Sequence, residues 1–338
     1  MPRPTALSHH QRATINEELH PMSSALRLSL LLAVTLACLP LTGVAQTRIT
    51  YKSAKSTSSY YQMAVQIAEA IKAATDGQVL VTVEESQGSV QNVKEARRRG
   101  ASYVFTSPPS LIQRALEGTE PFRADADYSD LRSLFPIPSL TMHFVMGADS
   151  GVEGFADFDG QRFLIGKGSF GARKAAEVFA SLGLEERVQL LDSELNAAVP
   201  ALKNGQVDGF ATAGSFPAPN VVEAAAAMPI HLLSLDEGQL QQVKGTPIEI
   251  PAGTYSGVDA PTTTISLPVG AYTLAAMDEA TAYAVTEAFW TRKDAMARSS
   301  GWWQGVTPEL LATLAVPLHP GAQRYYQDAG IPLPDALR

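Results

Sequence analysis

Short apolar runs alternate with longer segments of helical periodicity along most of this chain, and this alternation restricts its fold more than any other feature. Residues 48–52 (RITYK) predict a strand, and residues 59–74 predict an amphipathic helix because apolar residues recur there at three- and four-residue spacing. The cycle repeats over residues 79–116, and a second series begins near His143. Such alternation is typical of mostly parallel sheets covered by crossover helices. We therefore predict an α/β fold with two such units in series, which suits a chain of 338 residues.

Five loops follow predicted strands and open predicted helices, and all five are rich in hydroxyl groups or glycine. They are residues 52–59 (KSAKSTSS), 87–92 (QGSVQN), 106–110 (TSPPS), 166–171 (GKGSFG) and 213–217 (AGSFP). In open α/β sheets this edge is where ligands bind, because helix N-termini leave N–H groups unpaired and carry partial positive charge. The pattern predicts a pocket that holds a small anion.

The N-terminal segment predicts export. Residues 28–41 form an apolar run that is too short to span a bilayer as a stable helix. Small residues at 43–45 complete a signal peptide over residues 1–45, with Met22 as an alternative start. Cys38 is the only cysteine and lies in a poor lipoprotein box, so lipidation is the less favoured alternative. We predict a periplasmic protein whose mature chain contains no thiol.

Residues able to carry catalysis are sparse after residue 45. His143, His231 and His319 lie far apart and show no metal-ligand spacing, so we predict no catalytic residue, no metal and no cofactor. The 34 acidic residues exceed the 26 basic ones, which disfavours a nucleic-acid partner. One alternative stays open: residues 166–171 match a dinucleotide fingerprint, with Asp192 about 20 residues further on, as in an exported nicotinamide-dependent enzyme.

Several motifs together resemble the TAXI subgroup of solute-binding proteins from TRAP-type transporters. They are Ser59-Tyr60-Tyr61, Gly88-Ser89 with Asn92, the turn at 166–171, NGQVDG at 204–209, PAGTY at 251–255 and HPGAQRYY at 319–326. The resemblance implies a two-lobed periplasmic-binding-protein fold of type II, a small carboxylate in the cleft and a TRAP-type permease as partner. Apolar strands near residues 143 and 265 are suited to cross between the lobes. We therefore expect residues 47–141 plus 265–338 in lobe 1 and residues 142–264 in lobe 2.

The resemblance also implies a set of ligand contacts, which map to Ser59, Tyr60, Asn92, Thr106, Ser107, Ser169, Ser215, Pro217 and Tyr255. Lys52 and Lys55 stand where the family generally has glycine, and Lys167 lies beside Ser169. These lysines predict a ligand with more negative charge than a zwitterionic amino acid, such as a di- or tricarboxylate or an acidic amino acid. A binding protein that serves sensing and no longer serves transport is the second alternative.

Overall fold

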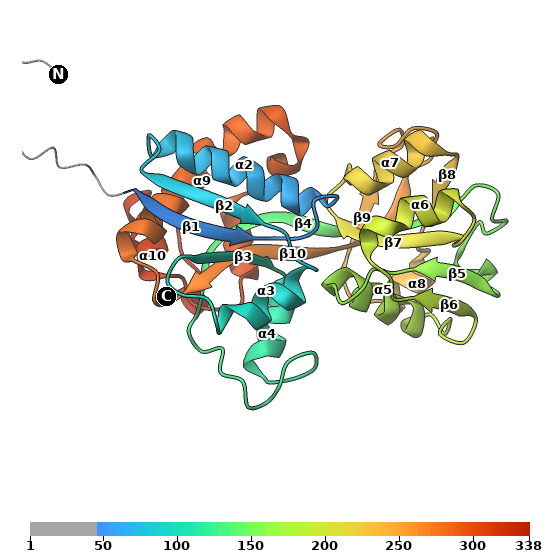
Figure 1. Cartoon of the computed structure of the whole chain (residues 1–338), viewed down its shortest axis with the longest axis horizontal. Coiled ribbons are helices and arrows are strands. Elements are labelled where there is room, and N and C mark those ends of the chain that lie inside the picture. Colours follow the sequence, from blue (N-terminus) through green and yellow to red (C-terminus); the bar gives the residue numbers. More distant parts are fainter. Residues whose placement is uncertain (1–45) are drawn as a thin grey trace, which may run out of the picture. The chain divides into compact units, whose positions relative to one another are not determined.

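The computed structural model describes residues 46–338. The predicted signal peptide, the alternative start at Met22 and Cys38 lie outside the described residues. One mixed sheet runs through the described part of the chain (Figure 1). Its strands follow the order β2-β1-β3-β10-β4-β7-β5-β6, with β8 paired to β4 and β9 paired to β10.

The first lobe contains three parallel strands near the N-terminus and helices on both faces of the sheet. The strands are β1 (Thr47–Lys52), β2 (Val79–Glu84) and β3 (Tyr103–Ser107). Helices α2 (Ser59–Ala74) and α9 (Glu279–Ser299) lie on one face, and α3 (Ser89–Ala96) and α4 (Pro109–Leu116) on the other (Figure 1). α10 (Pro320–Asp328) packs on α9, and short 3-10 turns occupy Gly301–Gly305, Pro308–Thr313 and Asp335–Leu337.

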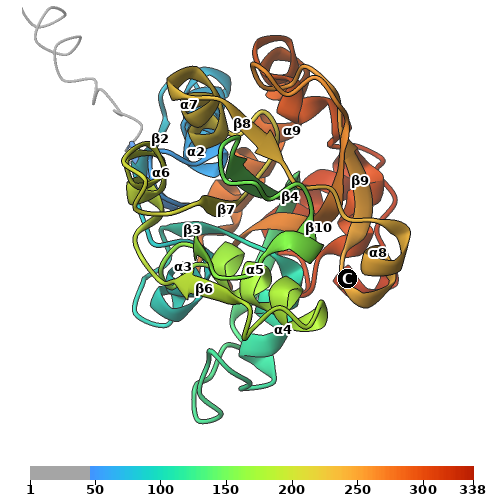
Figure 2. The same cartoon turned by 90° about the vertical axis from the view of Figure 1, so that its right-hand side faces the viewer.

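The second lobe also combines strands of the common sheet with helices packed against them (Figure 2). Its strands are β5 (Gln161–Leu164), β6 (Val188–Leu191), β7 (Gly209–Gly214), β8 (Ile230–Leu232) and β9 (Thr246–Ile250). Its helices are α5 (Phe170–Ser181), α6 (Ala198–Lys203), α7 (Pro219–Ala227) and α8 (Glu237–Gln242), with 3-10 turns at Phe155–Asp157 and Leu195–Ala197. Aromatic rings fill its core, where Phe158 packs edge-on against Phe163 and Phe179.

Two long antiparallel strands connect the lobes: β4 (Leu131–Gly147) and β10 (Thr262–Leu274). β4 pairs with β10 along its first part and with β7 at its end. Their mutual register shifts between Leu267 and Val269, and Pro138 of β4 and Pro268 of β10 fall in this interruption. Proline has no N–H to donate, so it is tolerated where the ladder is already broken.

The structure confirms the predicted α/β class and the two-lobed architecture. It also confirms the helix at 59–74 and the strand at 188–191 with the expected limits. The exact division into 47–141 plus 265–338 and 142–264 stays a prediction. None of the helices in the described residues is both long and apolar enough to cross a bilayer.

Candidate ligand-binding site

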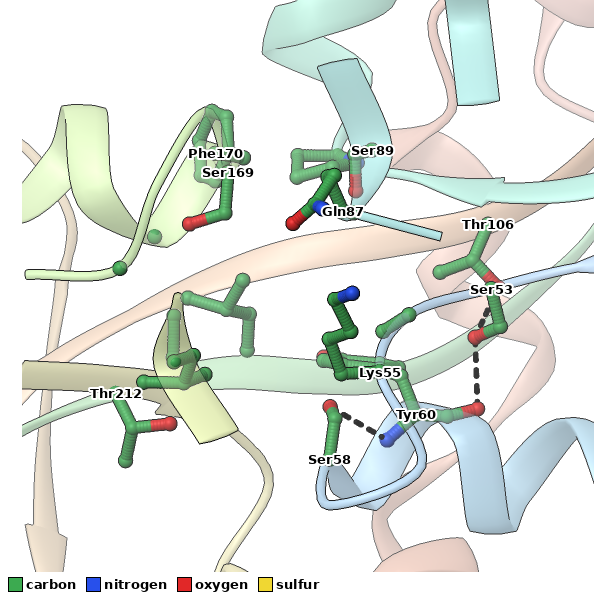
Figure 3. Close-up of a pocket in the computed structure, with 18 of the residues that line it drawn as sticks. Ser53, Lys55, Ser58, Tyr60, Gln87, Ser89, Thr106, Ser169, Phe170 and Thr212 are labelled. Carbon is green, nitrogen blue, oxygen red and sulfur yellow. Dashed lines mark hydrogen bonds between the residues drawn. The ribbon is translucent and has the colours of Figure 1, made fainter. Parts of the chain in front are cut away.

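A cavity of about 60 Å³ lies where loops of the two lobes face each other (Figure 3). The loops follow β1, β2 and β3 of the first lobe and β5 and β7 of the second, which is the sheet edge that the sequence predicts. Hydroxyl groups come from Ser53, Ser58, Ser89, Thr106, Ser169 and Thr212. The apolar part is lined by Ala54, Leu140, Ile165, Phe170, Leu195 and Val269. The cavity therefore combines hydroxyl donors with an apolar wall, as small-molecule sites commonly do.

Three helices begin at this cavity. The hydroxyl of Ser58 caps α2 by accepting from the N–H of Tyr60 at 3.2 Å, and that of Ser169 caps α5 by accepting from Ala172 at 2.9 Å. α3 starts after Gly88, whose φ of 114° is accessible to glycine and strained for other residues. The first N–H groups of each helix lack intrahelical partners and carry partial positive charge. The three helix starts give the cavity a positive potential that suits an anionic group.

The glycines of the GKGSFG segment have a conformational explanation. Gly166 and Gly168 have positive φ values of 86° and 62°. A Cβ atom on Gly171 would lie 2.6 Å from the Cβ of Ala213, so glycine lets α5 pack closely on β7. The cavity of about 60 Å³ beside this turn is much smaller than the ~300–1,000 Å³ typical of sites for larger ligands, and Asp192 is exposed outside it. The segment thus forms a wall of the small cavity.

The structure places Lys52 in an internal ion pair, and its predicted contact with a ligand stays a prediction. Its side chain is only 7% exposed and lies outside the cavity lining. Its Nζ donates to Glu95 Oε2 at 2.7 Å. Arg99 joins the same cluster through Glu95 and Glu84. Burying a lysine is costly unless a carboxylate pairs with it, and Glu95 supplies that partner. Lys52 is therefore an internal ion-pair residue of the first lobe.

Glu95 makes this cluster sensitive to acid. Burial opposes its ionisation, but hydrogen bonds from Lys52, Gln91 and Arg99 lower its pKa from 4.5 to about 2. A carboxyl with a depressed pKa stabilises the fold above its unfolded pKa, and this stability is lost as the pH falls through the folded value. We expect the wild type to lose on the order of 3 kcal/mol from this group between about pH 4.5 and pH 2.

Urea unfolding at a series of pH values checks this expectation. In Glu95→Gln the pH dependence over this interval should be shallower, whereas Glu69→Gln, an exposed change on α2, should leave it unchanged. Equal slopes for Glu95→Gln and wild type would show that the cluster does not contribute.

Lys55 does line the cavity, and its charge is already paired. Its Nζ lies 3.4 Å from Glu194 Oε2 on the opposite lobe, and Gln87 Nε2 donates to Glu194 Oε1 at 3.0 Å. Figure 3 shows the Lys55 side chain between the start of α2 and Gln87. Glu194 thus joins two lining residues of the first lobe to the second lobe and supplies the counter-charge of Lys55.

Other predicted residues divide into two groups. Tyr60, Thr106 and Ser169 line the cavity together with Lys55. The remaining ones, Ser59, Asn92, Ser107, Ser215, Pro217 and Tyr255, lie outside its lining, and their contact with a ligand stays a prediction. Burial raises the pKa of Tyr60, and its hydroxyl donates to Pro138 O at 2.8 Å, so its phenol is a neutral group bound to β4.

The residues outside the lining hold the loops in place. Ser59 Oγ accepts from the N–H of Ser215 at 3.0 Å, which joins the start of α2 to the end of β7. Ser215 Oγ in turn donates to Ser139 O at 2.7 Å. Ser107 is fully buried, and its hydroxyl donates to Pro108 O. Pro217 follows this segment with a cis peptide bond to Phe216.

Tyr255 belongs to a buried polar network behind the second lobe's loops. Its hydroxyl accepts from the N–H of Ala218 and lies 2.8 Å from His143 Nε2. His143 Nδ1 is 3.1 Å from Thr141 O, which can only accept, so Nδ1 carries the proton and Nε2 accepts from Tyr255. Burial lowers the pKa of His143 to about 4, which keeps the ring neutral. His143 and Tyr255 are thus structural partners.

Several lining residues were not singled out by sequence reasoning. Ser53, Gln87 and Ser89 lie in loops that the sequence predicts at the site. The sequence does not indicate which residues of those loops line the cavity. Thr212 precedes the predicted loop at the end of β7. Leu140 and Val269 come from the long strands next to the interrupted register, and no sequence motif marks them.

These features define a two-lobed α/β protein with a small cavity between its lobes, and comparison with solved structures gives several similar chains. The periplasmic binding protein BugD matches with 10% identity over 85% of this chain and 99% of its own, with a TM-score of 0.54. DctP7, a Bordetella pertussis extracytoplasmic solute receptor binding pyroglutamic acid, matches with 16% identity over 84% of this chain and 93% of its own, with a TM-score of 0.45. A TRAP periplasmic solute-binding protein of Actinobacillus succinogenes with bound L-galactonate matches with 14% identity over 84% and 92%, with a TM-score of 0.44.

The likeness to BugD establishes the periplasmic-binding-protein fold. Residues 52–330 match the NMT1-like family. Because this match covers most of the sequence, the chain belongs to the NMT1-like family.

Proposed function

We propose that this protein is an exported solute-binding protein that captures a small organic anion between its lobes and delivers it to a TRAP-type membrane transporter. The observation that carries the proposal is the convergence of three helix starts and six hydroxyl groups on one small cavity. The helix starts offer N–H groups and partial positive charge to one anionic group. The hydroxyls of Ser58, Ser89, Ser169 and Thr212 can donate to it, whereas those of Ser53 and Thr106 donate within the protein. The ionisable side chains in the lining are Lys55, Lys167 and Tyr60, which suits retention of a ligand without a reaction.

The finer assignment follows from the sequence motifs. We place the chain in the TAXI subgroup, with residues 1–45 as a cleaved signal peptide and the periplasm as its location. We assign lobe 1 to residues 47–141 plus 265–338 and lobe 2 to residues 142–264. The shared interruption at Pro138 and Pro268 is then the hinge, since the two strands exchange fewer hydrogen bonds there. Hinged closure around a ligand is common in such proteins.

A thermal-shift screen over amino acids and mono-, di- and tricarboxylates tests the proposal. A true ligand at 100 times its Kd adds about 2.7 kcal/mol to stability. Thr212→Val, which removes one lining hydroxyl at nearly constant volume, should weaken binding of the ligand found by about 10- to 150-fold, because a hydrogen bond to a charged group contributes ~1.5–3 kcal/mol. Ser181→Ala, at the exposed end of α5, should leave affinity unchanged. If no small anion in the screen raises the melting temperature, the proposal is contradicted.

The ligand class is tested at Lys55 and Glu194. We propose a di- or tricarboxylate or an acidic amino acid, whose second carboxylate takes the place of Glu194 at Lys55. Lys55→Met should then weaken succinate-like ligands about tenfold, and Glu194→Gln should strengthen them, because it removes the competing charge. Calorimetric titration at two salt concentrations measures both effects. If the two variants bind a dicarboxylate as the wild type does, Lys55 does not contact the ligand.

A further inference from the structure

A second cavity, of about 550 Å³, lies between α4 of the first lobe and α5 of the second. Phe170 lines both this cavity and the smaller ligand cavity, so the two cavities are neighbours. Ser110 and Leu111 on α4 face Ala176 and Ala180 on α5. Any molecule that fills this space therefore contacts both lobes at once.

Four cationic side chains line the second cavity: Arg114 from α4, Arg173 and Lys174 from α5, and Lys244 from the loop before β9. The carboxylates in the same lining are Glu177 and Glu185. The surplus of positive charge is unusual for a protein with a net charge of −8. We define these four cations as the basic cluster.

Lys174 is the most informative member of the basic cluster because it is almost fully buried. Its side chain is 3% exposed, and its Nζ donates to Glu177 Oε1 at 3.3 Å. An ammonium group has three donors, so this contact leaves donor capacity toward the cavity. Burial lowers the pKa of Lys174, Glu177 opposes that shift, and Lys244 adds to it. Two lysine charges are thus held close enough to repel each other.

The partial positive charge at the start of α5 adds to this electrostatic repulsion. Arg173 and Lys174 are the fourth and fifth residues of α5, near its positive end, and the first turn of that helix contains no acidic residue. Cations near a helix N-terminus are electrostatically unfavourable, and an anion there is favourable. An anion bound among these side chains would offset both the helix charge and the repulsion between Lys174 and Lys244.

The two arginines already connect the lobes through one residue. Arg114 Nη1 donates to the backbone oxygen of Glu120 at 2.7 Å, and Arg173 Nη1 lies 3.5 Å from Glu120 Oε1. Arg114 and Glu120 belong to the first lobe and Arg173 to the second. The arrangement brings guanidinium groups of both lobes to one place, where a bidentate acceptor with more charge than Glu120 could bind them.

We propose that the basic cluster is a second anion site that takes a small, doubly charged oxyanion such as phosphate or sulfate. Because the site is built from both lobes, its occupant stabilises the closed arrangement and raises the affinity of the neighbouring ligand cavity. The coupling is reciprocal, so the ligand also tightens the oxyanion. The oxyanion site itself does not depend on the proposed transport function, and only the coupling rests on it.

Calorimetry with inorganic phosphate tests the site directly, against sodium chloride at matched ionic strength. We expect one phosphate per chain, with Kd raised at least tenfold in Lys244→Gln and in Lys174→Gln. Lys244 is exposed, so its variant remains informative if Lys174→Gln fails to fold. Lys203→Gln, an exposed change on α6 outside both cavities, should bind phosphate as the wild type does.

Three results would overturn the proposal. The first is a calorimetric titration in which phosphate gives no more binding than chloride does at matched ionic strength. The second is loss of phosphate binding in Thr212→Val with retention in Lys244→Gln, which would place the ion in the ligand cavity. The third is binding to phosphatidylglycerol vesicles without binding of free phosphate, which would make the cluster a lipid-headgroup contact. A failed solute screen together with normal phosphate binding would reject the transport proposal and leave the oxyanion site in place.

Discussion

Replacing Asn92 with alanine is expected to lower the free energy of unfolding by about 2–4 kcal/mol. Asn92 is fully buried, and its Nδ2 donates to Ser53 O at 2.7 Å and to Thr106 O at 3.1 Å. Alanine would leave both carbonyl groups without this donor and would open a small cavity. Because Ser53 and Thr106 line the ligand cavity, the variant should also bind ligand more weakly.

Urea denaturation of Asn92→Ala beside Asn204→Ala provides the measurement. Asn204 is exposed at the end of α6, so its replacement should change stability by less than about 0.5 kcal/mol. Unchanged stability of Asn92→Ala combined with a large loss of affinity would support the prediction that Asn92 contacts the ligand directly.

Tyr255→Phe is expected to destabilise the second lobe by about 2–4 kcal/mol while leaving ligand affinity nearly unchanged. The substitution removes the acceptor of the Ala218 N–H and the donor to His143 Nε2, and both groups are buried. Two buried polar groups without partners cost more than the hydrogen bonds contributed, which is why the loss of one oxygen atom has a large effect.

Thermal unfolding and ligand titration of the same variant separate stability from binding. Tyr61→Phe, on the partly exposed side of α2, serves as the matched control and should behave as the wild type. A Tyr255→Phe variant that melts normally but binds poorly would show that the hydroxyl acts on the ligand and not on the fold.

Local periodicity was sufficient for the short elements of this fold. The helix at 59–74 and the strand at 188–191 have clear patterns, and the structure has them with the same limits. The first half of β4 was missed because Pro136 and Pro138 lie inside it, and proline usually indicates the end of a strand. Pro138 is tolerated at the interruption between β4 and β10, a long-range feature that no local pattern contains, whereas Pro136 pairs with Gly270 inside the ladder.

At the candidate site, too, local sequence patterns predict the loops but not the partners of individual side chains. The five predicted loops do surround the cavity, since that prediction needs only the rule that ligands bind at the carboxyl edge of such sheets. The position of each lysine side chain depends on a carboxylate far away in the sequence. Glu95 pairs with Lys52, and Glu194 of the other lobe pairs with Lys55. In the sequence Glu95 lies in the charged run at 94–99 (KEARRR), which is typical of the exposed face of a helix, so its pairing with Lys52 could not be inferred.

The position of β10 also determines the order in which this protein can fold. β10 lies between β3 and β4, and its residue Tyr272 pairs with Phe105. Until residues 262–274 have been synthesised, the facing edges of β3 and β4 have no strand between them. Contacts so distant along the chain form slowly. The second lobe's β5, β6 and β7 can pair with one another earlier, whereas the sheet of the first lobe is completed only when the C-terminal part arrives.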